Sequence, residues 1–452
     1  MGATEKFAKF VVGTTFDKIP LKVLTYSKEL MLDAIGCALA GSVTETGKIM
    51  TDFVRQLGGV EESSVIAGGF RTAAPNAAFA NGTLCHSMDY DDLGYHGHPS
   101  GTVVPVLLAL GEKLKSSGKE IMEAHAVGFE VYGKIAEHSK ELYAGGWHPT
   151  AIFGTMGAVA AASRMLKLTV EQTMNAFGIA VSQTSGAKAN FGTMTKPLHS
   201  GNAARTGIVS AMLAKGGFTG RPDIIEHPTG FAYAFIREGN YDLDKMVESL
   251  GNPLRMEYWP PGIKKYDCCG GNHNALDSMF TLIKQHNIKY EDVESVVVDC
   301  DSRVGDILVY PEPQSGHESR FSLHYNMALA LLDGKFDRHS HTDERAAKPD
   351  IHAAVKKVNV VIHPEWPASY KGRKHPVTIK LKDGRTVTHT TDHVKGSPEN
   401  PLARDELMAK YTDCAGTVLS AADIKKSAEL VLKIDELKNI SELMDILVAK
   451  PC

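Results

Sequence analysis

The spacing of apolar residues changes once along this chain, close to Trp259-Pro260-Pro261. From about residue 20 to about residue 250, apolar side chains recur every three or four positions, which is the spacing of a buried helix face. After the break, β-branched residues dominate VESVVVD (293–299) and KVNVVIH (357–363), as is typical of strands. The change predicts a helical part followed by a mixed part.

Local signals divide the first part into helices. The segment 119–138 repeats the helical spacing, and Thr169-Val170-Glu171-Gln172 fits a capping box. Asn202 is a candidate N-cap for the helix that follows it. The run 155–166 is rich in Ala and Gly, which predicts closely crossing helices because small side chains let two backbones approach.

The second part carries strand and turn signals. HPVTIKL and RTVTHTT are joined across Lys382-Asp383-Gly384, and an Asp-Gly pair favours a tight hairpin turn. At 452 residues the chain is too long for one typical core. We therefore expect a mainly α fold: a large all-helical domain (1–257 and 401–452) and a smaller α+β domain (258–400) inserted before the C-terminal helices.

Composition excludes several classes of function. A formal net charge of −4 gives no basic surface for nucleic acid. No apolar run approaches the roughly 18 residues of a membrane span, and the N-terminus lacks a signal-peptide layout. The seven cysteines are scattered and odd in number, which suits a reducing compartment, so a cytoplasmic location is expected.

Four polar stretches interrupt the apolar pattern. HSMDYDDLGYHGHPSG begins at His86 and contains three acids and three histidines, and the other stretches are centred on GGWHPT, NFGTMTKPLHSGN and KKYDCCGGNH. If they converge, Asp89 lies among a set of cationic groups: His98, His148, Lys196, Lys264 and His273. Such a site suits a small di- or tricarboxylic acid, because the cations bind its carboxylates while the aspartate acts as a base.

Simpler interpretations exist for each stretch. An isolated histidine in a turn is usually a structural hydrogen-bonding residue, and Cys268-Cys269 lacks the CxxC spacing of a zinc site. A metal site built from His86, Asp89, Asp91, His96 and His98 is a further alternative. Their spacing matches no known metal motif, so no metal is expected.

At these residues the sequence resembles the MmgE/PrpD family. The resemblance rests on HSMDYDDLGYHGHPSGTVVPVLLALGE, GGWHPTAIFGTMGAVAAA, NFGTMTKPLHSGNAARTGIVSAML, the segment 264–273 and FSLHYNMALALLDGKF, in family order. The family includes 2-methylcitrate dehydratase, cis-aconitate decarboxylase and iminodisuccinate epimerase. The resemblance implies a helical domain with an α+β lid, a homodimer, and catalysis without metal or organic cofactor.

The resemblance also implies roles for individual residues. The family's active-site aspartate falls on Asp89, and its histidines and lysines fall on His98, His148, Lys196 and Lys264. The late tyrosine of the family falls on Tyr325. We expect Asp89 and His98 to move the substrate proton, Tyr325 or His273 to handle a second proton, and Lys196, His148 and Lys264 to bind carboxylates. Cys269 is also expected to contact the substrate.

Two positions depart from the decarboxylase pattern: Leu93 replaces a threonine, and Cys269 replaces a lid histidine. The CCGGNH segment likewise differs from that of 2-methylcitrate dehydratases. These departures leave the substrate open and favour a lyase of the dehydratase type. A cofactor-independent epimerase of an iminodisuccinate-like acid is one alternative, and a non-catalytic carboxylate-binding protein is another.

Overall fold

The computed structural model describes residues 1–139, 142, 145–337, 339–366 and 374–449, which form two compact units. The first unit comprises Met1–Ala189, Thr195–Gly262 and Ala403–Cys452, and the second comprises Asn190–Met194 and Ile263–Leu402. The boundaries expected from sequence were 257/258 and 400/401, and the segment Asn190–Met194 was not expected. Cys452 lies outside the described residues.

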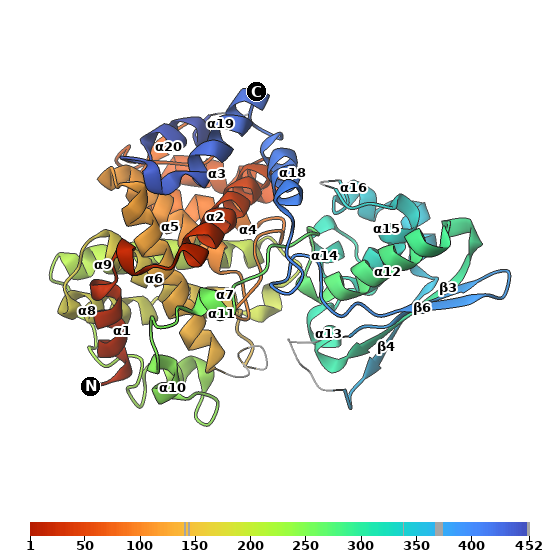
Figure 1. Ribbon diagram of the computed structural model, residues 1–452, viewed down its shortest axis with the longest axis horizontal. Coiled ribbons are helices and arrows are strands. Elements are labelled where there is room, and N and C mark those ends of the chain that lie inside the picture. The colour runs from red at the N-terminus through yellow and green to blue at the C-terminus, as the bar shows by residue number, and fades with distance from the viewer. Residues whose placement is uncertain (140–141, 143–144, 338, 367–373, 450–452) are drawn as a thin grey trace. The chain divides into compact units, whose positions relative to one another are not determined.

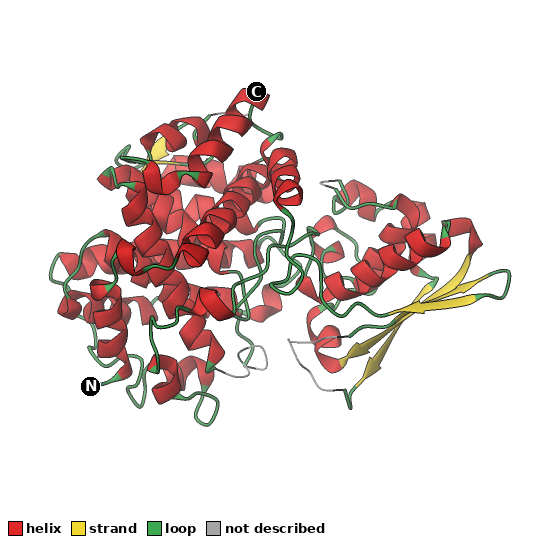
Figure 2. Ribbon diagram, in the orientation of Figure 1, coloured by secondary structure: helices red, strands yellow, loops and turns green. Residues whose placement is uncertain are grey.

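The first unit is helical apart from one short strand pair (Figure 2). Its α-helices are α1 (Ala3–Gly13), α2 (Leu21–Ser42), α3 (Glu45–Leu57), α4 (Ala74–His86), α5 (Pro99–Leu114), α6 (Gly118–Glu137), α7 (Pro149–Met165), α8 (Val170–Val181), α9 (Thr195–Lys215), α10 (Leu243–Val247), α11 (Arg255–Tyr258), α18 (Arg404–Ala415), α19 (Ala421–Leu432) and α20 (Ser441–Leu447). The strands β1 (Ser63–Ser64) and β2 (Arg71–Thr72) pair antiparallel. The prediction of a mainly α chain is confirmed. Among the described residues, no helix is long and apolar enough to span a bilayer.

A side-chain cap confirms one predicted helix start, and another predicted start is corrected. Thr169 caps α8 by the expected reciprocal bonds with Gln172, at 3.2 and 3.0 Å. The prediction that Asn202 caps the next helix is wrong, because α9 already begins at Thr195. Pro197 is tolerated in the first turn, where its missing N–H would have no partner within the helix. As a result, Lys196 lies in the first turn of α9 and not in a loop.

Small residues allow the central helices to cross closely, as the run 155–166 predicted. In α7, a Cβ on Gly157 would lie 2.9 Å from the carbonyl oxygen of Gly128 in α6. Between α4 and α9, a Cβ on Gly82 would lie 2.8 Å from the Cα of Gly201. This crossing brings the C-terminal end of α4 beside the N-terminal start of α9, which is where His86 and Lys196 lie.

The second unit is a four-stranded sheet with helices (Figure 1). Its strands are β3 (Val293–Asp301), β4 (Val358–His363), β5 (Val377–Leu381) and β6 (Thr386–His389), in the order β4-β3-β5-β6. β3 pairs parallel with β4 and antiparallel with β5, with Val298 opposite both Val360 and Val377. The predicted hairpin is present as β5–β6, with Gly384 at φ +90° in its turn.

Helices enclose the core of this second unit. They are α12 (His273–His286), α13 (Ser302–Ile307), α14 (Gly316–Ser319), α15 (Leu323–Asp333), α16 (Asp343–Ala346) and α17 (Pro349–Val355). The helices α12 and α15 pack together, and α15 also packs on β4. The alternating strand residues Val296, Val298, Val377 and Ile379 are buried with apolar residues of both helices. The expected α+β composition of this part follows from that period-two burial.

Candidate active site

Three helices of the first unit begin with candidate residues. His98 precedes Pro99 at the start of α5, and His148 precedes Pro149 at the start of α7. Proline suits the first helical position because its missing N–H would be unbonded there, so each His-Pro pair fixes the helix start and places an imidazole at the N-cap. Lys196 lies in the first turn of α9, and α5, α7 and α9 pack against one another.

Asp89 lies in a strained turn that follows α4. Its φ is +51°, in the left-handed region, which costs most non-glycine residues about 1 kcal/mol. Aspartate tolerates this region better than most residues, and such conformations concentrate at functional sites. The turn directs the chain back toward α5, so that Asp89 and His98 face each other.

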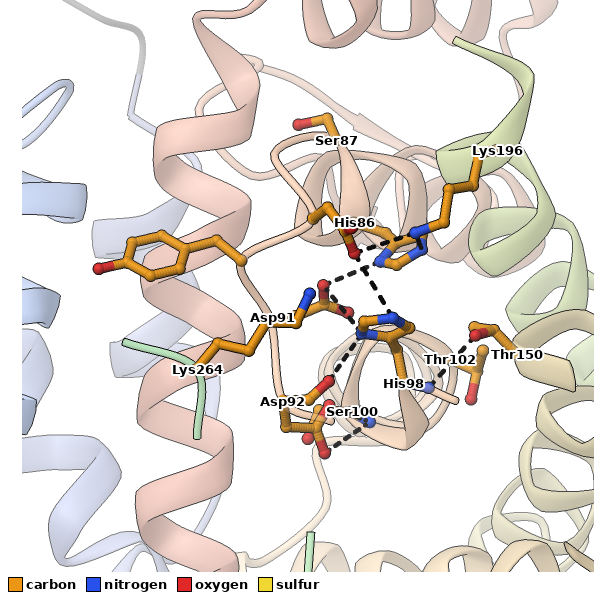
Figure 3. Close-up of polar contacts among 12 residues, drawn as sticks. His86, Ser87, Asp91, Asp92, His98, Ser100, Thr102, Thr150, Lys196 and Lys264 are labelled. Atoms are coloured by element: carbon orange, nitrogen blue, oxygen red, sulfur yellow. Dashed lines mark hydrogen bonds and ion pairs between the residues drawn. The ribbon is translucent and has the colours of Figure 1, made fainter. Parts of the chain in front are cut away.

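Asp89 is bonded from two sides. The Lys196 Nζ donates to Asp89 Oδ1 at 2.9 Å, and His98 Nε2 lies 3.4 Å from the same oxygen. The other ring nitrogen of His98 donates to the backbone carbonyl of Asp92 at 2.7 Å, because a carbonyl only accepts (Figure 3). His98 Nε2 can therefore bond to Asp89 only when one of the two carries a further proton. All three side chains are buried, so this cluster is arranged to hold and move a proton.

The other two acids of the DYDD run have different partners. Asp92 accepts from the backbone N–H of Ser100, in the first turn of α5, at 3.1 Å. Burial and the neighbouring Asp91 raise the pKa of Asp92 well above its ordinary value, which favours the neutral acid as a cap for that helix. Asp91 Oδ1 instead lies 2.8 Å from His86 Nδ1 and 3.5 Å from His98 Nδ1.

His148 contacts a second histidine that follows Lys196 by one helical turn. The Nδ1 atoms of His148 and His199 lie 3.1 Å apart, so one of them donates to the other. Burial, together with Lys196 and His86, lowers the pKa of His148 well below its ordinary value. Burial and His86 lower the pKa of His199 to about 4. This shift favours a neutral His148, which would bind a carboxylate as a hydrogen-bond donor; its place among the carboxylate-binding groups stays a prediction.

Comparison with known proteins identifies the family of this chain. Residues 5–244 match the MmgE/PrpD N-terminal domain, and residues 266–436 match the MmgE/PrpD C-terminal domain. The chain belongs to the MmgE/PrpD family. It is 31% identical to cis-aconitate decarboxylase of Mus musculus over 98% of this chain and 93% of that protein. It is 30% identical to the same enzyme of Homo sapiens over 98% and 94%, and 22% identical to 2-methylcitrate dehydratase of Escherichia coli (strain K12) over 78% and 77%.

These relatives confirm that the MmgE/PrpD chain is an enzyme of the lyase type, since dehydratases and decarboxylases both remove a group from carbon without hydrolysis. The structure also brings together Asp89, His98 and Lys196, as the family resemblance implied. Their individual roles stay predictions.

The remaining candidates belong to the second unit. The Lys264 Nζ donates to the carbonyl of Cys268 at 3.0 Å, and His273 Nε2 lies 3.3 Å from the same oxygen. The backbone N–H of Cys269 donates to the backbone carbonyl of Arg320 at 3.1 Å. The buried Tyr325 hydroxyl donates to the carbonyl of Ser340 at 2.7 Å, and burial raises its pKa. That these residues complete the site stays a prediction.

From the sequence, His86 and Asp91 were candidates only for the alternative metal site, and His199 had no assigned role. His199 lies three residues after Lys196, and that spacing places two residues on one helix face once the helix is known to start at Thr195. The pairing of His86 with Asp91 depends on the left-handed turn between them, which no periodicity reports.

A buried ion pair lies next to the turn that contains Asp89. The Lys410 Nζ of α18 lies 2.6 Å from Asp33 Oδ1 of α2 and donates to the backbone carbonyl of Tyr90 at 2.8 Å. All of these groups belong to the first unit, so its C-terminal segment contributes a cation beside the acidic loop, which contains Asp89, Asp91 and Asp92. The position of Asp89 therefore depends on a helix more than 300 residues away in sequence.

One group of side chains has the composition of a metal site. His86, Asp89, Asp91 and His98 offer ligand atoms that all lie within 4.8 Å of one another. The Lys196 ammonium, however, is bonded to two of the four, His86 Nε2 at 2.8 Å and Asp89 Oδ1 at 2.9 Å. A divalent ion at that position would have to displace a cation, so the donor set fits a metal poorly.

Proposed function

We propose that this MmgE/PrpD enzyme is a lyase that moves a proton at the carbon beside a carboxylate of a small di- or tricarboxylic acid. The observation that carries the proposal is the buried contact of Asp89 with both Lys196 and His98. It combines a carboxylate that can accept a proton with an ammonium that can hold an anion.

The chemistry requires both groups. A C–H group beside a carboxylate is a weak acid, because removing its proton places a second negative charge next to that of the carboxylate. Preorganised cations and N–H donors lower this barrier by stabilising the enediolate-like charge as it forms. In the proposed reaction, Lys196 and the neutral His148 hold the substrate carboxylate, and Asp89 with His98 takes the proton from carbon.

The fate of the electron pair decides the product. In dehydration, the C–H electrons form a C=C bond, the neighbouring C–O bond breaks, and the hydroxide leaves as water after taking a proton. In decarboxylation, a C–C bond breaks, CO₂ leaves, and the electron pair left on carbon takes a proton from the acid form of the same cluster. A proton returned to the opposite face of the carbon gives epimerisation.

Dehydration is the main proposal because of the sequence departures, and decarboxylation is a second proposal because of the comparisons. Leu93 is half-buried, and its backbone pairs with Gly262 through two 2.8 Å bonds, so an apolar side chain occupies this position beside the acidic loop. The cis-aconitate decarboxylases, in contrast, are more similar to this chain and match more of it than the 2-methylcitrate dehydratases do. Cis-aconitate therefore belongs on any substrate panel beside hydroxy acids.

Exchange in heavy water tests the proposal. The enzyme is incubated in D₂O with a panel of C4–C7 di- and tricarboxylic acids, and NMR and mass spectrometry follow C–H exchange, water loss and CO₂ release. We expect one acid to react in the wild type and not in Asp89→Asn or Lys196→Ala. Deuterium uptake with inversion but no other product would identify an epimerase. Binding without exchange for every acid would overturn the proposal in favour of a carboxylate-binding protein.

A further inference from the structure

A chain of three buried hydrogen bonds joins Asp91 to Asp89 and passes through Lys196, the residue proposed to bind the substrate carboxylate. Asp91 Oδ1 lies 2.8 Å from His86 Nδ1, and His86 Nε2 lies 2.8 Å from Lys196 Nζ (Figure 3). Lys196 Nζ in turn lies 2.9 Å from Asp89 Oδ1. All four residues are at most 4% exposed. Neither His86 nor Asp91 has a part in the proposed proton transfer.

Donation in this chain runs outward from Lys196, toward Asp89 on one side and through His86 toward Asp91 on the other. An ammonium has only donors, so His86 Nε2 must present its lone pair to Lys196. The neutral imidazole then carries its proton on Nδ1 and donates it to Asp91, which accepts. Burial lowers the pKa of His86, in keeping with a neutral ring. Asp91 thus selects the tautomer that makes His86 an acceptor for Lys196.

The opposite tautomer of His86 would weaken its contact with Lys196. With its proton on Nε2, His86 would direct an N–H at the Lys196 ammonium, and two donors facing each other in a buried place repel. The ionisable groups near Lys196 include Asp89, His86, His148 and His199, with Asp91 and His98 in the same cluster. Among these, His86 is the neutral acceptor bonded to the ammonium, opposite the charged acceptor Asp89.

We propose that His86, with its tautomer set by Asp91, is a positioning residue that directs the Lys196 ammonium toward Asp89 and the substrate carboxylate. This inference rests on the proposed function for its activity readout only. The competing explanation is that His86 merely fills space, since its ring also lies 4.4 Å from that of His98 and 5.8 Å from that of His148, measured between centroids.

Two amide substitutions separate the two ring nitrogens. The amide of His86→Gln reaches the position of Nε2 and can still accept from Lys196, whereas the amide of His86→Asn reaches the position of Nδ1 and leaves Lys196 without this acceptor. We expect His86→Gln to keep kcat within about 10-fold of the wild type. We expect His86→Asn to lose about 10- to 100-fold more, as for a lost hydrogen bond to a charged group. Equal losses in both variants would overturn the positioning role.

Asp92→Asn provides the matched control. Asp92 is a buried acid of the same loop that accepts from Ser100 N–H, which an amide oxygen can also do, and its raised pKa favours the neutral acid. We expect its kcat to stay within about 3-fold of wild type, because no strong bond is lost. A large loss in this control would show that the loop tolerates no amide, and the tautomer measurement then decides the proposal.

That measurement needs no turnover. In protein labelled with ¹⁵N-histidine, the nitrogen shifts of His86, assigned by their absence in His86→Gln, report which nitrogen carries the proton. We expect Nδ1–H with a bare Nε2 in the wild type. A proton on Nε2 would overturn the proposal. Absence of turnover on every acid of the panel would instead count against the proposed function, and the shifts would still test His86.

Discussion

Lys196 and Asp89 are 107 positions apart in sequence, yet their side chains meet at 2.9 Å inside the helical unit. The contact exists because α4 and α9 cross closely and because the chain turns through a left-handed residue directly after α4. Removing one partner of a buried ion pair leaves the other charge uncompensated. The ion pair therefore links the stability of the unit to the chemistry proposed for it.

Asp89→Asn is expected to abolish turnover while preserving the fold. Asparagine also tolerates a positive φ, so the turn survives, but an amide cannot accept the substrate proton. We expect kcat to fall at least about 100-fold, as for loss of a general base. Thermal unfolding and steady-state rates measure the two effects. Asp89→Ala should lose the rate and unfold more easily, and rates near the wild-type value in either variant would remove Asp89 from the mechanism.

Gly201→Ala is expected to separate α4 from α9. Its Cβ would collide with the carbonyl oxygen of Phe79, which belongs to the backbone and cannot rotate away. The resulting shift of the helices would move Lys196 from His86, so both stability and kcat should fall, the former by about 1–3 kcal/mol. Gly216→Ala, with no atom nearer than 3.4 Å to its Cβ, is the control. Urea unfolding with parallel rate measurements would detect the difference, and an unchanged kcat in Gly201→Ala would contradict the link.

His125→Leu is expected to make the enzyme less sensitive to acid. His125 is fully buried in α6 and stacks on Phe129 at 4.1 Å, and neither ring nitrogen has a hydrogen-bond partner among the described residues. Burial lowers its pKa from 6.5 to about 3. As the pH falls, the unfolded chain therefore binds a proton at His125 at a higher pH than the folded chain does. The contribution of neutral His125 to the free energy of unfolding is fully present above pH 6.5 and is lost as the pH falls toward 3.

The loss from this one group is at most about 4–5 kcal/mol across that range. Unfolding free energies measured from pH 7 to pH 4 should therefore decline less steeply in His125→Leu than in the wild type. The exposed His286 serves as control, and His286→Leu should keep the wild-type slope. Parallel slopes for wild type and His125→Leu would show that His125 does not titrate in this way.

Lys410→Met is expected to destabilise the enzyme and slow it. The substitution leaves Asp33 buried without its cation and removes a bond to the carbonyl of Tyr90, next to Asp89. Breaking one side of such a pair costs about 3–5 kcal/mol. Lys426→Met removes an exposed ion pair with Glu442 and should leave unfolding unchanged. Similar urea midpoints for the two variants would contradict a structural role for Lys410.

Local sequence signals predicted the elements well. The capping box at Thr169, the Asp-Gly turn and the alternating residues of β3 and β5 each act over a few positions, and the structure confirms them. The same is true of the close helix crossings, since Gly157 has no side chain to hold α6 and α7 apart. The start of α9 was missed because Asn202 offers a good cap on its own, while the helix actually begins before Pro197.

The site was only partly predictable for a different reason. Asp89, His98 and Lys196 lie in polar stretches that interrupt apolar helices, so their residue types were enough to select them. Which acid pairs with which histidine depends on a turn and on packing between α4, α5 and α9. The lowered pKa of His148 likewise results from burial and from the neighbouring Lys196, and the sequence alone reports neither the pairing nor the burial.

The contact between Lys410 and the acidic loop also bears on how the protein is made. A ribosome releases Tyr90 long before Lys410, which lies 320 positions later. Until α18 emerges, the nascent helical unit would have to bury Asp33 with no cation beside it, at a cost that favours leaving this region open to water. The loop that contains Asp89, Asp91 and Asp92 is therefore expected to fold last, after the ribosome has translated the whole second unit.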